Sequence, residues 1–178
     1  PNMLLVIDSS GSMTWAMRST TIAGEYHTAL VSAFAAMDFA FQKGCRVSAI
    51  NFSDGTRSCD WSNERAPVED VLLSYQGGGT VAPIKQIMSI CETAESNVMV
   101  LLITDAEVSN WKQMVDTVEI LTKRGHKLFM FHIGTGRGPK MSKMQQALQK
   151  AGASVYPIRK VDDLLGLVVR EVRTVYNK

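Results

Sequence analysis

The chain has 178 residues, of which 46% are hydrophobic and 20% are charged, and it carries 19 Lys and Arg against 17 Asp and Glu. This balance is typical of a folded globular protein and excludes disordered and fibrous chains. A length of 178 residues lies within the range of one domain, so we expect a single domain over residues 1–178. No apolar run approaches the roughly 18 residues of a membrane span, so we expect no membrane partner.

Apolar runs alternate with helical patterns from the beginning of the chain to its end. The runs predict six strands, at Met3–Ile7, Arg46–Phe52, Thr56–Trp61, Val98–Thr104, Lys127–Ile133 and Ser154–Ile158. The first strand begins with no lead-in structure before it, so we expect a domain cut from a longer chain. The Asp54-Gly55 pair is typical of a two-residue hairpin turn, which makes the third strand antiparallel and places it at an edge.

Helical spacing of apolar residues fills the intervals between most of the strands. A segment near residues 26–41 is apolar nearly all round, which predicts a buried helix. Further helices are expected after residue 84, over 111–123, after 141 and over 161–176. Strands that alternate with helices predict an α/β fold with a mostly parallel sheet covered on both faces.

The cysteines and the first residues bear on cellular location. Cys45, Cys59 and Cys91 are odd in number and form no spacing motif, which favours free thiols and a reducing compartment. The chain begins without the basic segment and cleavage site of a signal peptide. We therefore expect an intracellular, cytoplasmic domain.

The charges are distributed unevenly along the chain. Residues 1–122 carry 7 Lys and Arg against 14 Asp and Glu, whereas residues 123–178 carry 12 against 3. A basic third is compatible with an anionic partner such as nucleic acid. However, these basic residues are spread over several elements without interleaved aromatic residues, which favours solvated helix faces over a nucleic-acid site.

Small oxygen donors follow the strands that end at one edge of the expected sheet, where ligands of open parallel sheets gather. They are two carboxylates and three hydroxyls: Asp8, Ser10, Ser12, Thr80 and Asp105. Alternation around Gly11 lets a tight turn direct the first three at one point, and the glycines before Thr80 allow its backbone to approach. Hard cations such as Mg²⁺ prefer oxygen ligands of this kind. Any one of these residues alone would more simply cap a turn or a helix.

The segment Asp8-Ser-Ser10-Gly-Ser12, directly after an apolar strand, resembles the Asp-x-Ser-x-Ser signature of von Willebrand factor A (VWA) domains. Gly78-Gly79-Thr80 resembles the glycine-threonine loop of that family, and Ile103-Thr104-Asp105 resembles its strand-four aspartate. The resemblance spans the whole chain and includes all five positions of the metal-ion-dependent adhesion site. With the hairpin argument, it implies a doubly wound six-stranded sheet in the order 3-2-1-4-5-6, with strand 3 antiparallel.

The resemblance also implies a role for each matching residue. Ser10 and Ser12 look like direct ligands of Mg²⁺ or Mn²⁺. Thr80 would bind directly or through water, and Asp8 and Asp105 would act mostly through bridging waters and hydrogen bonds. An Asp or Glu of a protein partner would then complete the metal's coordination. This implies a non-catalytic, metal-dependent interaction module.

Two other functions stay open. One is a scaffolding or regulatory domain with a structural metal, whose partner is an AAA+ ATPase, as in some intracellular relatives, or another domain of the parent chain. The other is a metal-dependent hydrolase. A haloacid-dehalogenase-type phosphatase uses Asp-x-Asp after its first strand, but Ser10 stands where the general acid belongs, so this reading is disfavoured.

Four residues outside the metal set are candidates for partner contacts. Trp15 follows the metal loop directly and could anchor a partner or pack beneath the loop. Arg57, Arg137 and Lys140 are expected in loops that border the same edge, where they would steer an acidic partner or be solvated.

Overall fold

The computed structural model describes residues 1–13, 25–105, 108–134 and 141–177. Six strands form one sheet in the order β3-β2-β1-β4-β5-β6. They are β1 (Asn2–Asp8), β2 (Val47–Phe52), β3 (Thr56–Ser62), β4 (Val98–Thr104), β5 (Lys127–Ile133) and β6 (Ser154–Ile158). β3 pairs antiparallel with β2, and every other neighbouring pair is parallel. The expected fold class, strand order and antiparallel edge strand are confirmed.

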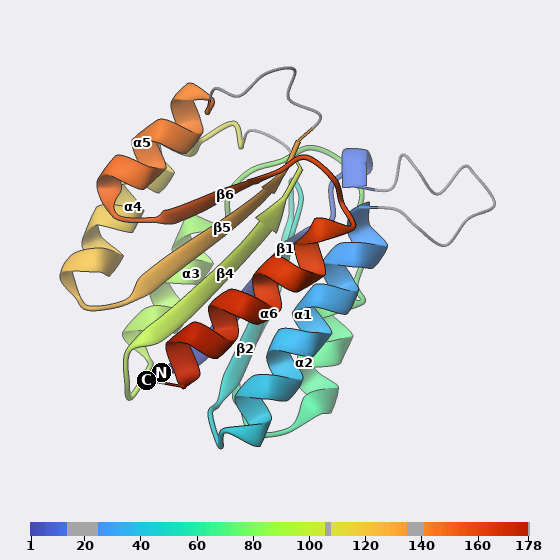
Figure 1. Ribbon diagram of the computed structural model, residues 1–178, viewed down its shortest axis with the longest axis vertical. Helices are drawn as coiled ribbons and strands as arrows, with labels where there is room; N and C mark the ends of the chain where they lie inside the picture. The colour runs from blue at the N-terminus through green and yellow to red at the C-terminus, as the bar shows by residue number, and fades with distance from the viewer. Residues whose placement is uncertain (14–24, 106–107, 135–140, 178) are drawn as a thin grey trace.

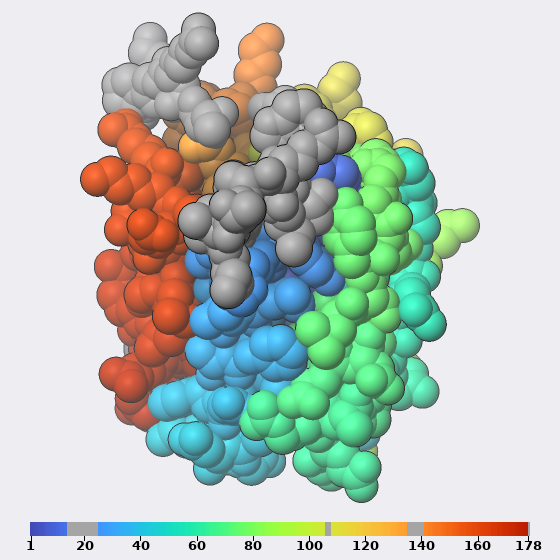
Figure 2. Space-filling model, turned by 90° about the vertical axis from the view of Figure 1, so that its right-hand side faces the viewer, coloured from blue at the N-terminus to red at the C-terminus, as the bar shows by residue number. Residues whose placement is uncertain are grey.

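Helices cover both faces of this sheet (Figure 1). On one face lie α1 (Glu25–Gln42), α2 (Arg65–Leu72) and α6 (Asp163–Tyr176), and on the other lie α3 (Ile84–Glu92), α4 (Trp111–Lys123) and α5 (Lys143–Ala151). Figure 2 shows α6, α1 and α2 side by side on the first face. In β1, Met3, Leu5 and Ile7 pack toward that face, whereas Leu4 and Val6 pack toward the other. Burial on both faces explains why this strand is apolar throughout.

Helix α1 is less buried than its sequence predicts. Its inner side packs on the sheet through residues such as Ala29, Ala33 and Met37, which are at most 1% exposed. Its outer side is open, and Val31 is 39% exposed. The prediction of a buried helix therefore holds for its inner side only, because α2 and α6 pack beside α1 rather than over Val31.

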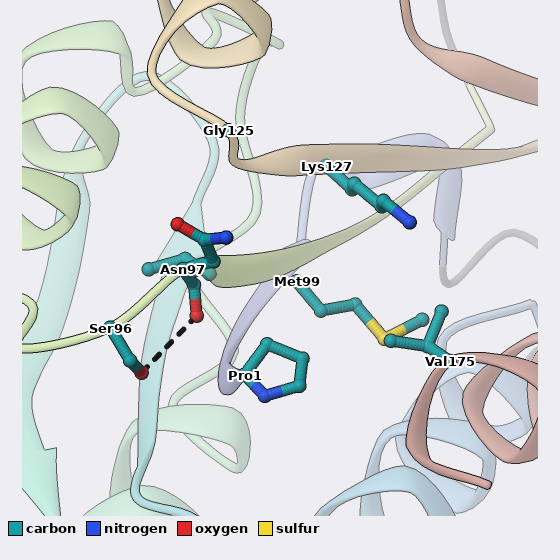
Figure 3. Close-up of a pocket in the computed structure, with 8 residues that line it drawn as sticks. Pro1, Ser96, Asn97, Met99, Gly125, Lys127 and Val175 are labelled. Carbon is teal, nitrogen blue, oxygen red and sulfur yellow. Dashed lines mark hydrogen bonds between the residues drawn. The ribbon is translucent and has the colours of Figure 1, made fainter. Parts of the chain in front are cut away.

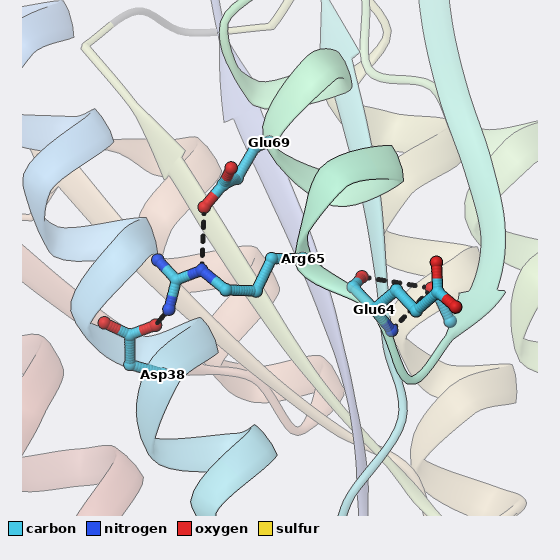
Figure 4. Close-up of polar contacts among 5 residues, drawn as sticks. Asp38, Glu64, Arg65 and Glu69 are labelled. Carbon is cyan, nitrogen blue, oxygen red and sulfur yellow. Dashed lines mark hydrogen bonds and ion pairs between the residues drawn. The ribbon is translucent and has the colours of Figure 1, made fainter.

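The sequence analysis assigns no element to the segment that forms α2. Val68, Val71 and Leu72 follow helical spacing and are buried, but this two-turn helix is too short for a strong periodic signal. Packing of this apolar side against β2 fixes the helix. Arg65, in the first turn, pairs with Asp38 of α1 and with Glu69 one turn later (Figure 4).

The parallel pairing brings the carboxyl ends of three strands together. Asp8 lies opposite Phe52 of β2, and Ile7 lies opposite Ile103 of β4. The residues that follow β1, β2 and β4 therefore leave the sheet at one edge.

In the described part of the chain, no helix has the length and apolar character that crossing a membrane requires.

All three cysteines are free thiols: Cys91 is buried, and Cys45 and Cys59 are half-buried. Burial raises the pKa of the Cys91 thiol to about 12, and only the thiolate is a good nucleophile. Burial also raises the pKa of the half-buried Cys59 thiol. We expect a disulfide-exchange reagent at pH 8 to label Cys45 first and Cys59 more slowly, while Cys91 reacts only on unfolding. Denatured protein without reductant should show three thiols. A count of one would contradict the free-thiol prediction.

Candidate metal centre

A tight turn follows β1 and carries the first part of the candidate site. Asp8 is fully buried, and its Oδ1 accepts a hydrogen bond from the backbone N–H of Ser10 (2.7 Å). The backbone N–H of Met13 then donates to the carbonyl of Ser10 (3.1 Å). An aspartate that bonds the backbone two residues ahead is a common way to fold the chain back on itself. The Asp-x-Ser-x-Ser segment is thereby closed into a compact loop.

Four of the five predicted ligand residues meet in this loop and beside it. The hydroxyls of Ser10 and Ser12 are 3.1 Å apart, and Ser12 donates to Oδ1 of Asp105 (2.7 Å). On the other side of the cluster, the Thr104 hydroxyl donates to Oδ2 of Asp8 (2.6 Å). Residues 93 positions apart in the chain are thus joined by one hydrogen bond. We call Asp8, Ser10, Ser12 and Asp105 the oxygen cluster.

Thr80 lies on the loop next to the oxygen cluster. The carbonyl of Gly78 accepts a hydrogen bond from the backbone N–H of Gly11 (3.0 Å), and the carbonyl of Thr80 accepts one from Ser109 (3.1 Å). Within the described residues, no hydrogen bond joins the Thr80 hydroxyl to the cluster. The loop's proximity follows from the backbone contacts, but the role of the Thr80 hydroxyl as a ligand stays a prediction.

The cluster's electrostatics favour a cation. Burial raises the pKa of Asp8, against the lowering effect of the hydrogen bonds from Thr104 and Ser10. Burial also raises the pKa of Asp105 to about 6; the charges of Asp8 and Glu25 add to this rise, and the Ser12 hydrogen bond opposes it. Two partly desolvated carboxylates therefore lie close together, and an adjacent cation would lower the cost of ionising them.

The donor set fits a hard divalent cation. It consists of carboxylate and hydroxyl oxygens, which suit Mg²⁺ or Mn²⁺ rather than metals that prefer sulfur or imidazole. In residues 1–13, 25–105, 108–134 and 141–177, no group of three or more His, Cys, Asp or Glu side chains is placed to hold a metal. The oxygen cluster itself contains two carboxylates, Asp8 and Asp105, and its other oxygens are hydroxyls.

A prediction on pH follows from the raised pKa of Asp105. Because its ordinary value is 3.8, the folded metal-free protein binds more protons than the unfolded chain between about pH 4 and 6. The free energy of unfolding in EDTA should therefore fall as the pH rises through this window. Asp105→Asn removes the free-energy cost of holding an ionised carboxylate at this half-buried position. The variant should therefore be more stable than the wild type by about 1 kcal/mol at pH 7 in EDTA, after discounting for solvent screening.

Urea unfolding at pH 4 and pH 7, in EDTA, would measure this difference for the wild type and the variant. The variant's advantage should be present at pH 7 and absent at pH 4. A variant that is less stable than the wild type at pH 7 in EDTA would show that the Asp105 carboxylate is not strained in the metal-free protein.

A buried polar network beneath the site was not anticipated from the sequence. Asn51 of β2 is fully buried, and its Oδ1 accepts a hydrogen bond from the Ser9 hydroxyl (2.5 Å). Its Nδ2 donates to the carbonyl of Leu72, at the end of α2 (3.2 Å), which also accepts from the Tyr26 hydroxyl (2.7 Å). Gln76 Nε2 donates to the carbonyl of Asn51 (2.8 Å). An Asn within the apolar run of β2 was the available signal.

The four residues predicted to contact a partner are not brought to the oxygen cluster by any contact in the described part of the chain. Arg57 lies in β3, paired opposite Asn51, and not in a loop as expected. It is exposed, and its guanidinium donates to the hydroxyl of Ser74, just beyond α2, rather than to any residue of the cluster. Trp15, Arg137 and Lys140 lie outside the described residues. Their roles stay predictions.

A cavity of about 390 Å³ lies at the opposite edge of the sheet, where β4 and β5 begin (Figure 3). Apolar atoms of Met99 and Val175 line it beside Pro1 and Lys127. It contains none of the predicted site residues. The oxygen cluster is therefore not the floor of this cavity, and Ser12 within the cluster is exposed.

Comparison with known proteins identifies the fold. No family model and no curated protein matches the sequence. Among solved structures, the pilus adhesin SpaC from Lactobacillus rhamnosus GG, in its open conformation, has a TM-score of 0.74 and 14% identity over 99% of this chain and 30% of that one. This chain thus spans about a third of the adhesin's length.

Two further structures are similar to the chain. A von Willebrand factor type A protein from Catenulispora acidiphila has a TM-score of 0.66 and 17% identity, over 96% of this chain and 42% of that one. The conserved hypothetical protein BatB from Bacteroides thetaiotaomicron has a TM-score of 0.67 and 13% identity, over 99% of both chains. At these identities the likeness concerns the fold alone, and that fold is of the VWA type.

Proposed function

We propose that this chain is a metal-dependent protein-interaction module. Ser10, Ser12 and Thr80 would hold Mg²⁺ or Mn²⁺, with Asp8 and Asp105 behind them. The observation that carries the proposal is the oxygen cluster, in which side chains from the ends of β1 and β4 converge through hydrogen bonds at one edge of the sheet. The adhesin among the structural neighbours supports an interaction role at the level of the fold.

The chemistry of the ligand set indicates what the partner supplies. Hydroxyl ligands are neutral, so a metal held mainly by Ser10, Ser12 and Thr80 keeps most of its positive charge. The metal would supply an electrophilic centre to which a carboxylate binds. Ser12 is exposed and Asp105 is half-buried at this edge, whereas Asp8 and Ser10 are buried, so an Asp or Glu of another protein would approach the metal from the side of Ser12 and Asp105. At such an exposed rim, water screens the attraction, and neighbouring contacts must add specificity.

Carboxylate binding to the loaded protein tests this function without a known partner. Mn²⁺ bound to the protein should enhance water-proton relaxation, and sodium acetate should reduce the enhancement by displacing a metal-bound water. Acetamide at the same concentration, with NaCl to match ionic strength, is the neutral control and should leave the enhancement unchanged. Equal effects of acetate and acetamide would contradict carboxylate capture and favour a structural metal.

A further inference from the structure

The loop from Gly77 to Thr80 is held by its backbone from two sides. On the side of β1, the N–H of Gly77 donates to the carbonyl of Ser9 (2.9 Å), and the carbonyl of Gly78 accepts from Gly11. On the side of β2, the N–H of Val81 donates to the carbonyl of Ser53 (3.0 Å). These contacts fix where the loop lies relative to the oxygen cluster.

One side chain makes a further contact with this loop. The backbone N–H of Gly79, directly before Thr80, donates to Oδ2 of Asp54 (2.9 Å). Asp54 belongs to the turn between β2 and β3, which a hydrogen bond from Ser53 N–H to the carbonyl of Gly55 (2.9 Å) closes. The bond therefore ties the glycine loop to a short, closed hairpin. Hydrogen bonds to a charged acceptor are among the stronger ones in proteins.

The glycines are what allow Asp54 to approach so closely. A Cβ at Gly78 would lie 2.6 Å from Oδ2 of Asp54, and a Cβ at Gly79 would lie closer still to Oδ1. Gly78 also has a φ of +91°, which side chains rarely adopt, whereas Gly79 has no such constraint. The absence of a side chain at Gly79 is thus explained by the neighbouring carboxylate.

Among the residues that the structure describes, no other contact explains the position of Asp54. Within the described part of the chain, its carboxylate makes no ion pair, and its side-chain hydrogen bond is the one to Gly79. The residue itself is exposed. A carboxylate at the tip of a hairpin can be solvated without any neighbouring backbone. The close approach of Asp54 to Gly78 and Gly79 therefore indicates a specific role for this contact.

We propose that Asp54 is a positioning residue for the candidate metal site: its carboxylate fixes the backbone at Gly79 and so sets the place of Thr80. The effect on metal affinity rests on the proposed function, whereas the effect on the loop does not. Asp54 acts through the N–H of Gly79 rather than as a ligand. An amide oxygen at the same position can accept the same hydrogen bond, so Asn should replace Asp54 where Ala cannot.

Amide hydrogen exchange of the metal-free protein, in EDTA, measures the loop directly. We expect Asp54→Ala to speed exchange of the Gly79 amide by about tenfold or more, the factor that matches loss of a bond to a charged acceptor. Asp54→Asn keeps a neutral acceptor, which makes a weaker bond, so its Gly79 amide should exchange more slowly than in Asp54→Ala and within about threefold of the wild-type rate. Asp60→Ala is the matched control, since it removes an exposed carboxylate from β3, the strand that follows the turn of Asp54. It should leave the exchange rate of the Gly79 amide unchanged.

Metal binding is the second measurement on the same variants. Mn²⁺ affinity should fall about tenfold in Asp54→Ala and stay near the wild-type value in Asp54→Asn. Gly79→Ala, which pushes the carboxylate away, should weaken binding similarly. The double variant Asp54→Ala/Gly79→Ala should bind Mn²⁺ only slightly more weakly than either single variant, because both substitutions break the same contact.

Unchanged Gly79 exchange in Asp54→Ala would overturn the proposal. It would also be overturned if Asp54→Asn lost affinity as Asp54→Ala does, since the charge would then matter rather than the hydrogen bond. If the wild type bound no Mn²⁺ at all, the proposed function would be wrong, and the exchange rates would still decide whether Asp54 holds the loop.

Discussion

Mn²⁺ binding should disappear in Asp8→Asn. The wild type is expected to bind weakly, at around 10⁻⁴–10⁻³ M, because few charged ligands contact the metal directly. Asp8 is fully buried and accepts hydrogen bonds from both Ser10 and Thr104. The Asn side chain has the volume of Asp8 but lacks its charge and one of its two acceptor oxygens. The substitution therefore weakens the attraction for the cation and disturbs the hydrogen bonds that shape the loop. A Mn²⁺ relaxation titration measures the change.

Asp60→Asn provides the control for net charge, since Asp60 is exposed on β3 and distant in the fold from the β1 loop. It should bind Mn²⁺ as the wild type does. Circular dichroism should show that both variants are folded, because Asn also fills the space of Asp8. Binding of Mn²⁺ to Asp8→Asn at wild-type affinity would remove Asp8 from the site.

The largest effect on stability is expected at Asn51. Asn51→Ala removes the acceptor of the Ser9 hydroxyl and the donor to the Leu72 carbonyl, in a region closed to water. Breaking a buried polar network leaves its other members unsatisfied, so the free energy of unfolding should fall by roughly 2–4 kcal/mol. Urea unfolding followed by circular dichroism gives this value.

Asn63→Ala, at an exposed position after β3, serves as the comparison and should change the free energy of unfolding by less than about 0.5 kcal/mol. A second readout connects the network to the site. Because Ser9 also accepts from Gly77, amide shifts of the glycine loop should move in Asn51→Ala. A loss below about 1 kcal/mol would mean that water or neighbouring groups replace Asn51 readily.

The elements of the sheet could be predicted because each strand carries its own signal. The strand β1 differs from the expected Met3–Ile7 by one residue at each end, and β2 begins one residue later than expected. Burial on both faces makes such runs apolar throughout, which is visible in a single sequence. Helix α2 could not be predicted in the same way, since its eight residues give only a short helical period and it is packing against β2 that fixes it.

The oxygen cluster could be predicted because its residues lie at strand ends, and the strand order brings those ends together. Asp8, Ser10, Ser12 and Asp105 meet as expected. What could not be predicted is the set of supporting contacts. Whether Asn51 reaches Ser9, or Asp54 reaches Gly79, depends on the register of β2 against β1 and on the exact course of two loops.

Paramagnetic broadening tests the location of the metal most directly. Mn²⁺ added below one equivalent broadens the amide signals of residues near its binding site in a ¹H–¹⁵N spectrum. The proposed site predicts selective loss of the signals of Ser10, Ser12, Thr80 and Asp105. The signals of Asn97 and Lys127, at the opposite edge of the sheet, should be preserved. Uniform broadening, or selective loss at that opposite edge, would contradict a metal site at the carboxyl ends of β1 and β4.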